Sequence, residues 1–429
     1  MKGADLSILD SLTHWDGKGF VPIEHAKTVL EALGNPQDSI KAVHVTGTNG
    51  KGTVCALIAA MLYADGNSVG HFASPHLSNV TERCIVNGTS VEPERFARAA
   101  ERVIAEAQTL DITLTYFVTG AIASFLVFQE LGLDWMVIEV GLGGRLDATN
   151  TMKAPRACVV TGVGLEHTQW LGDTVEEIAK EKAGIARKDV PLFVGGVSKE
   201  VEEVIQLEAS NLGATAKFFN FDFSLDNSLI PESVSKKFPG KHNESNMSLA
   251  CAVARSIGVS DTAIKKGLEI AIWPGRYEFG VFVKEDGVSQ NVLFDCAHNA
   301  DGVNALFQTL SNELSYAHLV IVFSVVDRKD WKEMLRTIKQ YESKLKIKVD
   351  WVFTHSGYHT AVAPEELQAF YGKGEIEKDC FKAFLKACSM SQPKSLVLIT
   401  GSIFLIGALR PKVLKKPFST LDREALSAV

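Results

Sequence analysis

The residues 47–53, Gly-Thr-Asn-Gly-Lys-Gly-Thr, combine the types that bind a triphosphate. Glycines let the backbone curl so that its N–H groups face an anion, and a helix that begins there adds positive potential. An apolar run precedes this segment and apolar residues at helical spacing follow it, which predicts a strand–loop–helix unit. Lys51 would supply a point charge to the β- and γ-phosphates, and the Thr53 hydroxyl would lie near Mg²⁺. Because Gly52 separates Lys51 from Thr53, the spacing is not the standard one, and a plain glycine turn is the alternative.

Three further polar residues follow apolar runs in the first half of the chain. They are Ser74, Glu139 and His167. In an open parallel sheet, ligands bind beyond the carboxyl ends of the strands. A hydroxyl, a carboxylate and an imidazole beside a triphosphate would form a Mg²⁺ site, although an all-oxygen set is more usual for this cation. Taken singly, each residue could instead be a loop anchor or a hydrogen-bonded structural residue.

Lys182 lies on the apolar face of a predicted helix. The helix begins with a capping box from Thr174 to Glu177, and Lys182 comes seven residues after the apolar Val175. Burial of an unpaired ammonium costs several kcal/mol or lowers its pKa. The alternative is a lysine at the C-terminal end of a helix whose charged end extends to solvent. The pattern alone leaves both interpretations open.

A second polar group follows an apolar run that ends at Asp295. It consists of Asp295, His298 and Asn299, which suggests another ligand site at a strand end. Arg276 ends a Trp-Pro-Gly-Arg break and would be able to contact a phosphate from either side. The alternatives are helix capping by Asn299 and Asp301, and a surface arginine.

Two blocks of alternating strand and helix patterns would position these residues. The runs are short, rich in β-branched residues and almost continuously apolar, which is typical of strands buried on both faces. In the first block they are 42–46, 69–73, 135–140, 157–163 and 191–194, and in the second 292–295, 318–323, 349–354 and 395–400.

The stretch between the blocks, 218–246, is rich in Asn, Ser, Pro and Lys and predicts a hairpin or loop region. Helices are expected over about 244–257 and 260–271, followed by a hinge at 273–276. We therefore expect two domains, 1–272 and 277–429.

The bulk properties are those of a globular enzyme with more than one core. The chain has 429 residues, of which 46% are hydrophobic and 22% are charged. The net charge of −7 argues against a general nucleic-acid partner. No run is apolar for long enough to cross a membrane, and the first residues do not have the pattern of a signal peptide. Seven cysteines without a Cys-x-x-Cys pair indicate reduced thiols and a cytoplasmic location.

These motifs resemble the Mur-ligase superfamily, and Lys-Gly-Thr at 51–53 favours its folate branch. Matches run in order along nearly the whole chain and are similar to folylpolyglutamate synthases and bacterial bifunctional dihydrofolate/folylpolyglutamate synthases. They are 47–53, 74–77 with 81–83, 139–150, His167 with Leu171-Gly172, 181–185, Trp273-Pro274-Gly275-Arg276, and Asp295 with Ala297-His298-Asn299.

The resemblance implies an α/β fold. It consists of an N-terminal P-loop ATPase-like parallel sheet with helices on both faces and a smaller Rossmann-like C-terminal domain. ATP would be held by Gly47, Thr48, Asn49, Gly50, Lys51, Gly52, Thr53, Asn246, Arg276 and Asp295. Mg²⁺, at two sites, would be bound by Ser74, Glu139 and His167, and the substrate by Arg83, Leu146, Asp147, Ala148, Phe20 and Val21. Lys182 would be carbamylated, and His298 would lie near ATP or glutamate. The implied catalytic residues are Lys51, Lys182 and His298, in a monomer.

The chain departs from the family pattern at four positions. Glu166 stands where Asp is usual, Cys296 where a small residue is usual, Val118 where Glu is common, and Asn243 where Gln is usual. The first two flank the expected site and concern the metal and ATP. The other two concern the substrate side.

The implied reaction joins glutamate to a pteroate or folate carboxylate through an acyl phosphate, with ADP and phosphate as products. A member restricted to dihydropteroate or to folates is the nearest alternative. A cell-wall ligase of the Mur type and a nucleotide-binding protein without ligase chemistry are the others. Gly52 and the 74–77 segment argue against the cell-wall ligase.

Overall fold

The computed structural model describes residues 22–224, 226–313 and 315–422 and the single positions 6, 9, 12 and 425. The chain forms two compact units. The first contains the described residues up to Ser235, Lys241–Ile272 and the described residues from Ser419 onward, and the second contains Lys236–Gly240 and Trp273–Phe418. The expected second domain extends to 429, whereas the chain from Ser419 belongs to the first unit, where Ser419 forms a bridge with Thr89.

The first unit is built on an eight-stranded sheet of order β4-β3-β2-β5-β1-β6-β7-β8. Strands β2, β5, β1, β6, β7 and β8 are parallel, and β3 and β4 add an antiparallel edge. The strands are β1 (Lys41–Thr46), β2 (Val69–Phe72), β3 (Cys84–Val86), β4 (Thr89–Ser90), β5 (Trp135–Glu139), β6 (Ala157–Val160), β7 (Pro191–Val194) and β8 (Thr215–Phe218).

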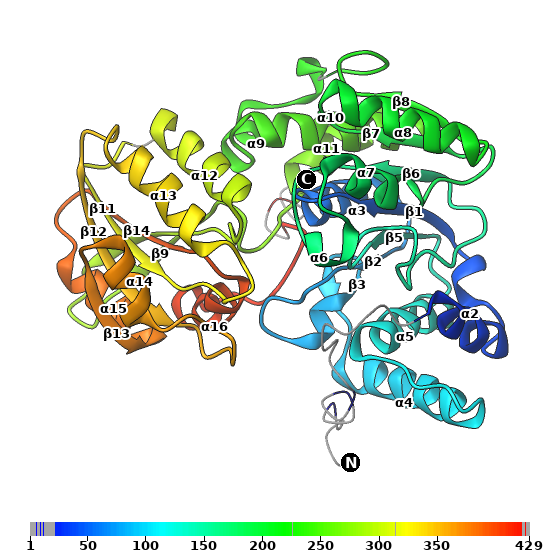
Figure 1. Ribbon diagram of the computed structural model, residues 1–429, viewed down its shortest axis with the longest axis horizontal. Helices are drawn as coiled ribbons and strands as arrows, with labels where there is room; N and C mark the ends of the chain where they lie inside the picture. Colours follow the sequence, from blue (N-terminus) through cyan, green and yellow to red (C-terminus); the bar gives the residue numbers. More distant parts are fainter. Residues whose placement is uncertain are drawn as a thin grey trace. The chain divides into compact units, whose positions relative to one another are not determined.

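Helices cover both faces of this sheet (Figure 1). Helices α2, α4 and α5 pack on one face against Ala42, Phe72 and Ile138, and α7 and α8 pack on its other half against Val160 and Leu192. Helices α3, α10 and α11 lie together on the opposite face. The helices are α2 (Ile23–Ala32), α3 (Lys51–Ala64), α4 (Pro93–Thr109), α5 (Tyr116–Glu130), α6 (Thr168–Leu171), α7 (Val175–Ala183), α8 (Lys199–Asn211), α9 (Glu232–Lys237), α10 (Lys241–Ser256) and α11 (Asp261–Ile270), with short 3₁₀ turns η1 (Pro36–Asp38), η2 (Val80–Arg83) and η3 (Asn227–Leu229).

The second unit has a six-stranded sheet of order β13-β12-β11-β14-β10-β9, in which only the β9–β10 pair is antiparallel. Helices α12, α13 and α14 pack on one face around Ile321, Trp351 and Leu398, and α15 and α16 contact the strands from the other. The elements are β9 (Glu278–Val283), β10 (Ser289–Phe294), β11 (His318–Phe323), β12 (Lys348–His355), β13 (Glu375–Asp379), β14 (Ser395–Thr400), α12 (Ala300–Glu313), α13 (Trp331–Glu342), α14 (Pro364–Tyr371), α15 (Cys380–Met390) and α16 (Ile403–Leu414).

The predicted fold class is confirmed, and every predicted strand run contains or overlaps a strand. The hairpin or loop expected over 218–246 is wrong in part, because α9 and the start of α10 lie there. No described helix is long and apolar enough to span a membrane. All seven cysteines are free, and all but Cys380 are buried.

Candidate active site

The loop between β1 and α3 has a backbone that only glycine accommodates at two positions. Gly47 has φ +146°, and a Cβ there would lie 1.9 Å from Thr161 Oγ1. Gly50 has φ +87°, and a Cβ there would lie 2.5 Å from Asn246 Oδ1. Positive φ and close packing together require glycine. The phosphate-loop interpretation therefore rests on backbone geometry as well as on sequence, and it places Asn246 of α10 against the loop.

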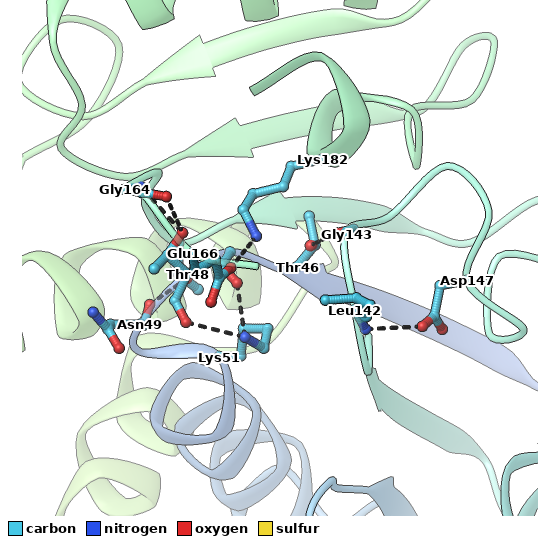
Figure 2. A network of polar contacts seen from close by, with 12 residues as sticks. Thr46, Thr48, Asn49, Lys51, Leu142, Gly143, Asp147, Gly164, Glu166 and Lys182 are labelled. Carbon is cyan, nitrogen blue, oxygen red and sulfur yellow. Dashed lines mark hydrogen bonds and ion pairs between the residues drawn. The ribbon is translucent and has the colours of Figure 1, made fainter. Parts of the chain in front are cut away.

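The loop is fixed by hydrogen bonds to the chain after β6. The Thr161 hydroxyl donates to Asn49 O at 2.6 Å, and Thr48 N donates to Gly162 O at 2.9 Å. The Lys51 ammonium donates to Gly47 O at 2.7 Å and to Thr48 O at 3.1 Å, so it lies over its own loop (Figure 2). A lysine in this place would be able to exchange loop carbonyls for phosphate oxygens. Gly52 and Thr53 form the first turn of α3, in which Thr53 is buried.

Lys182 is buried with 1% of its side chain exposed, and its Nζ lies 2.6 Å from Glu166 Oε1. The capping box of Thr174 and Glu177 is present at the start of α7, as predicted. The extended, solvent-directed lysine is therefore wrong, and the buried one is correct. In Figure 2 the side chain of Lys182 points from its helix toward Glu166, on the side of the phosphate loop.

The charges of this pair are set by burial and by Lys51. Burial raises the pKa of the Glu166 carboxyl, but Lys182 and Lys51 outweigh it and hold the pKa at about 2. Burial lowers the pKa of Lys182 to about 8, although Glu166 opposes that change, and Lys51 lowers it further. We take Glu166 as an anion and Lys182 as an ammonium that loses its proton unusually easily. Lys51, Lys182 and Glu166 thus form one electrostatic cluster.

Two of the three predicted metal ligands are in contact. Glu139, at the end of β5, is 5% exposed and accepts the Ser74 N–H at 3.2 Å. Burial raises the pKa of the Cys55 thiol, and the charge of Glu139 raises it further, whereas Lys51 lowers it. Glu139 and Lys51 therefore both lie near Cys55 on α3. His167 has φ +46° and helps to lower the pKa of Glu166. The described residues contain no group of three or more His, Cys, Asp or Glu arranged to hold a metal.

Among the residues predicted to bind the substrate, Asp147 forms hydrogen bonds within its own loop. Asp147 is buried, and its Oδ2 accepts Gly141 N at 3.1 Å and Leu142 N at 3.0 Å. Its Oδ1 accepts the Thr149 hydroxyl at 2.6 Å. Leu146 and Ala148 flank it, and Ala148 is buried in the core of the unit. Arg83 ends η2 and is 8% exposed. Phe20 and Val21 lie outside the described residues.

In the second unit, hydrogen bonds hold the predicted residues Asp295 and His298 in the turn that follows β10. Asp295 Oδ2 accepts Tyr277 N at 2.9 Å, and Asp295 Oδ1 accepts Ala297 N at 2.8 Å. Burial raises the pKa of Asp295 despite the nearby Arg276. His298 Nδ1 lies 2.8 Å from Cys296 O, so its Nδ1 carries the proton.

Asn299 Oδ1 accepts Gly302 N at 2.7 Å, so the capping interpretation holds for Asn299. Asp295 and His298 thus carry two hydrogen bonds of the turn that leads from β10 to α12.

Three important residues were not predicted to take part. Thr161 holds the loop from the strand run 157–163, Glu166 pairs with Lys182, and Glu278 accepts hydrogen bonds beside Arg276. Only Glu166 had a signal in the sequence, as an unusual residue beside His167. The others are ordinary in type, and their partners lie far away along the chain.

Comparisons with known proteins agree with this architecture. Residues 45–254 match the Mur ligase middle domain, and residues 275–403 match the glutamate ligase domain of Mur ligases. The fold and the site thus define a two-domain ligase of the Mur type.

A dihydrofolate synthase/folylpolyglutamate synthase of Bacillus subtilis is 30% identical over 421 residues, which cover 90% of this chain and 94% of the relative. The chain belongs to the folylpolyglutamate synthase/dihydrofolate synthase family and is an ATP-dependent glutamate ligase.

Solved structures give the same result for the fold. Escherichia coli FolC in complex with DHPP and ADP superposes with a TM-score of 0.81 at 29% identity, covering 95% of this chain and 96% of that chain. A Yersinia pestis bifunctional folylpolyglutamate synthase/dihydrofolate synthase complexed with AMPPNP and Mn ion superposes with a TM-score of 0.80 at 27% identity, covering 95% and 96%.

Proposed function

We propose that this protein uses ATP to phosphorylate the carboxylate of dihydropteroate and of reduced folates, and then joins the acyl group to L-glutamate. A carboxylate oxygen attacks the γ-phosphorus, and ADP leaves. The amine of glutamate then attacks the acyl carbon and loses a proton, and phosphate leaves as the amide forms. The observation that carries the proposal is the grouping of charged residues beside one glycine loop. Lys51 bonds to Gly47 O in the loop, Lys182 pairs with Glu166, and Glu139 lies opposite Val45 at the end of the strand that leads into the loop.

The geometry of the loop supports the roles that we propose for its residues. Backbone N–H groups of 47–53 would bind phosphate oxygens, and Lys51 would neutralise the charge that develops on the transferred phosphoryl group. Asn246 packs on Gly50 and would support the nucleotide side of the loop. Arg276, Asp295 and His298 of the second unit are proposed to contact ATP or glutamate, as the family resemblance implies.

A divalent metal is part of this proposal, since the relative from Yersinia pestis was solved with AMPPNP and Mn ion. The buried carboxylate of Glu139 and the hydroxyl of Ser74 are oxygen donors of the kind that Mg²⁺ prefers, so these residues fit the ion. His167 would complete the set. The ion would supply charge neutralisation at the phosphates.

We also propose that Lys182 is carbamylated. Its pKa of about 8 leaves a fraction of neutral amine at neutral pH, and a neutral amine is the form that adds CO₂. The added carbamate would carry a negative charge beside Glu166, so the contact between the two side chains would have to change. Mass spectrometry of the intact protein under CO₂-rich and CO₂-free buffer would detect the added group.

An ADP-release assay with dihydropteroate or tetrahydrofolate, with and without L-glutamate, tests the reaction. We expect sustained ADP release only when both a carboxylate substrate and glutamate are present. AMP and pyrophosphate as products would refute the mechanism. Activity with only one of the two pteridine substrates would restrict the function to that substrate.

Variants separate a ligase from a nucleotide-binding protein without chemistry. Lys182→Ala is expected to abolish turnover while AMPPNP binding, measured by calorimetry, stays largely intact. Lys27→Met, which removes an exposed lysine of the same unit, is the control and should keep full turnover. The predicted monomeric state and cytosolic location are also proposals, which light scattering and cell fractionation would test.

A further inference from the structure

Arg83 is a buried cation whose charge has little compensation. Its side chain is 8% exposed, and burial lowers the pKa of its guanidinium. Its Nε–H donates to His76 Nδ1 at 3.0 Å, and its guanidinium carbon lies 5.1 Å from the centre of the Tyr116 ring. Within the described residues, no Asp or Glu oxygen lies within 4.0 Å of its nitrogens, and it makes no further hydrogen bond.

The other buried arginine among the described residues is a useful comparison. Arg410, 5% exposed, forms two hydrogen bonds with the carboxylate of Glu278, at 2.7 and 2.8 Å. Arg410 is thus paired in the way that buried charges usually are. Arg83 keeps an equally buried guanidinium without a carboxylate partner. Such an arrangement is costly in the free protein, and it is relieved when an anion binds.

The surroundings hold the Arg83 guanidinium in a fixed place. The preceding residue, Glu82, accepts the N–H groups of Leu77 and Ser78 at 2.7 and 2.8 Å, which ties the loop that starts at Ser74. His76 accepts through Nδ1, so its imidazole is neutral and occupies only Nε–H of the arginine. The two η-nitrogens form the planar fork that matches a carboxylate.

The Arg83 guanidinium lies in the part of the first unit that also contains Glu139 and Lys51. Glu139 acts electrostatically on Arg83, and Glu139 and Lys51 both act on Cys55. Arg83, Glu139 and Lys51 are therefore near neighbours in the first unit. A carboxylate that attacks the γ-phosphate must approach a polyanion, and a cation on its far side would offset this repulsion.

We propose that Arg83 binds, through Nη1 and Nη2, the substrate carboxylate that becomes the acyl phosphate, and that His76 and Tyr116 hold its guanidinium for this contact. The inference rests on the proposed function, and it assigns to Arg83 one group of the substrate rather than the pteridine ring. One carboxylate oxygen attacks phosphorus while the fork keeps the other in place.

A comparison of dihydropteroate with its neutral carboxamide tests this assignment. Calorimetry in the presence of Mg²⁺ and AMPPNP would measure the affinity of each ligand for the unsubstituted protein, for Arg83→Met and for Arg83→Lys. We expect Arg83→Met to weaken carboxylate binding roughly 10- to 100-fold, as expected for the loss of a charge-assisted pair, and to change carboxamide binding by less than about threefold. Arg83→Lys should recover part of the carboxylate affinity because it keeps the charge.

Controls make the result specific. In Arg83→Lys, the AMPPNP affinity and the midpoint of thermal unfolding should stay near those of the unsubstituted protein. The second control is Arg98→Met, at an exposed site on α4, which should leave the affinities for dihydropteroate and for its carboxamide unchanged. Equal weakening of carboxylate and carboxamide binding in Arg83→Met and in Arg83→Lys would overturn the inference, as would no weakening in either. If the unsubstituted protein binds AMPPNP but not dihydropteroate, the proposed function itself fails.

Discussion

The ion pair of Lys182 and Glu166 is the residue-scale feature with the largest energetic consequences. The pKa of both groups is lowered, and the two shifts differ in meaning. For Glu166 the lowered pKa means that the fold stabilises the charged form. For Lys182 it means that the cost of burial exceeds the gain from pairing. The pair therefore holds Lys182 inside the unit at a net cost, which suits a functional lysine better than a structural one.

Removal of Glu166 should therefore destabilise the first unit. In Glu166→Gln, the Lys182 ammonium would stay buried without a partner, and we expect a loss of about 3–5 kcal/mol in the free energy of unfolding at pH 7. Urea denaturation would measure it. The control is Glu181→Gln on the same helix, whose partner Arg145 is half exposed, with an expected loss of at most about 1 kcal/mol. Similar losses in both variants would contradict the buried-charge explanation.

The pH dependence of stability should separate the two groups. The folded-state pKa of Glu166, about 2, lies below its ordinary 4.5, so its contribution is present above pH 4.5 and is lost as the pH falls toward 2. The folded-state pKa of Lys182, about 8, lies below 10.5, so stability should rise with pH between these values, because the unfolded chain keeps the proton longer. We therefore expect the defect of Glu166→Gln to be smaller at high pH than at pH 7. A defect that grows with pH would contradict this assignment.

At the scale of elements, the β1–loop–α3 unit depends on two glycines that contact segments distant in the chain. Gly47→Ala would place a methyl group 1.9 Å from the Thr161 hydroxyl at a positive φ, so we expect the loop to shift. AMPPNP binding should weaken by at least about tenfold, since the loop amides would no longer converge on one anion. Gly66→Ala at the end of α3 is the matched control, because Gly66 also has positive φ, +88°, but has open space around it. It should cost about 1–2 kcal/mol of stability and leave nucleotide affinity unchanged.

The turn before β9 depends on a second buried pair. Glu278 accepts Gly275 N at 2.8 Å and is neutralised by Arg410 of α16, so it fixes the backbone next to Arg276. We expect Arg410→Met to lower the stability of the second unit by about 3–5 kcal/mol, because it removes the cation that neutralises the largely buried Glu278 carboxylate. Lys412→Met, at an exposed site of the same helix, should cost no more than about 1 kcal/mol. Equal urea midpoints for the two variants would contradict this role.

At the scale of the whole molecule, the chain has two units, each with a sheet covered by helices on both faces. The nucleotide loop and the Lys182–Glu166 pair belong to the first unit, and Arg276, Asp295 and His298 belong to the second. A nucleotide that binds the loop should stabilise the first unit directly.

Ligand-linked protection would test that expectation. With Mg²⁺ and AMPPNP at about 100 times the Kd, the free energy of opening of α3 should rise by up to about 2.7 kcal/mol. Hydrogen exchange of peptides from α3, read by mass spectrometry, measures the change. Lys51→Met should remove most of the protection, because the ammonium that bonds to Gly47 O and Thr48 O is missing. Equal protection in this variant would contradict the assigned position of the nucleotide.

The sequence by itself determined the central strands and the glycine loop, and it left the burial of Lys182 open until the structure was known. The first two features depend on local patterns, namely continuous apolar runs and glycines before a helix. The edge strand β13 was missed because charged residues predominate in it, Glu-Ile-Glu-Lys-Asp, so it lacks the continuous apolar run that marks the central strands. The edge strand β9 contains the apolar run Phe-Gly-Val-Phe-Val at 279–283 and was overlooked, although exposed and partly buried residues alternate along it in the structure.

Only the tertiary structure decided which distant groups meet. Thr161 and Asn49 are 112 positions apart, and Arg410 and Glu278 are 132 apart, yet each pair is joined by a hydrogen bond. Residue type does not reveal such pairs, because a threonine or a glutamate has the same local pattern whether or not a partner arrives. The buried Arg83 without a carboxylate partner is known for the same reason only from the fold. Local pattern determines secondary structure, whereas packing of segments distant in the chain determines the charge and partners of each buried group.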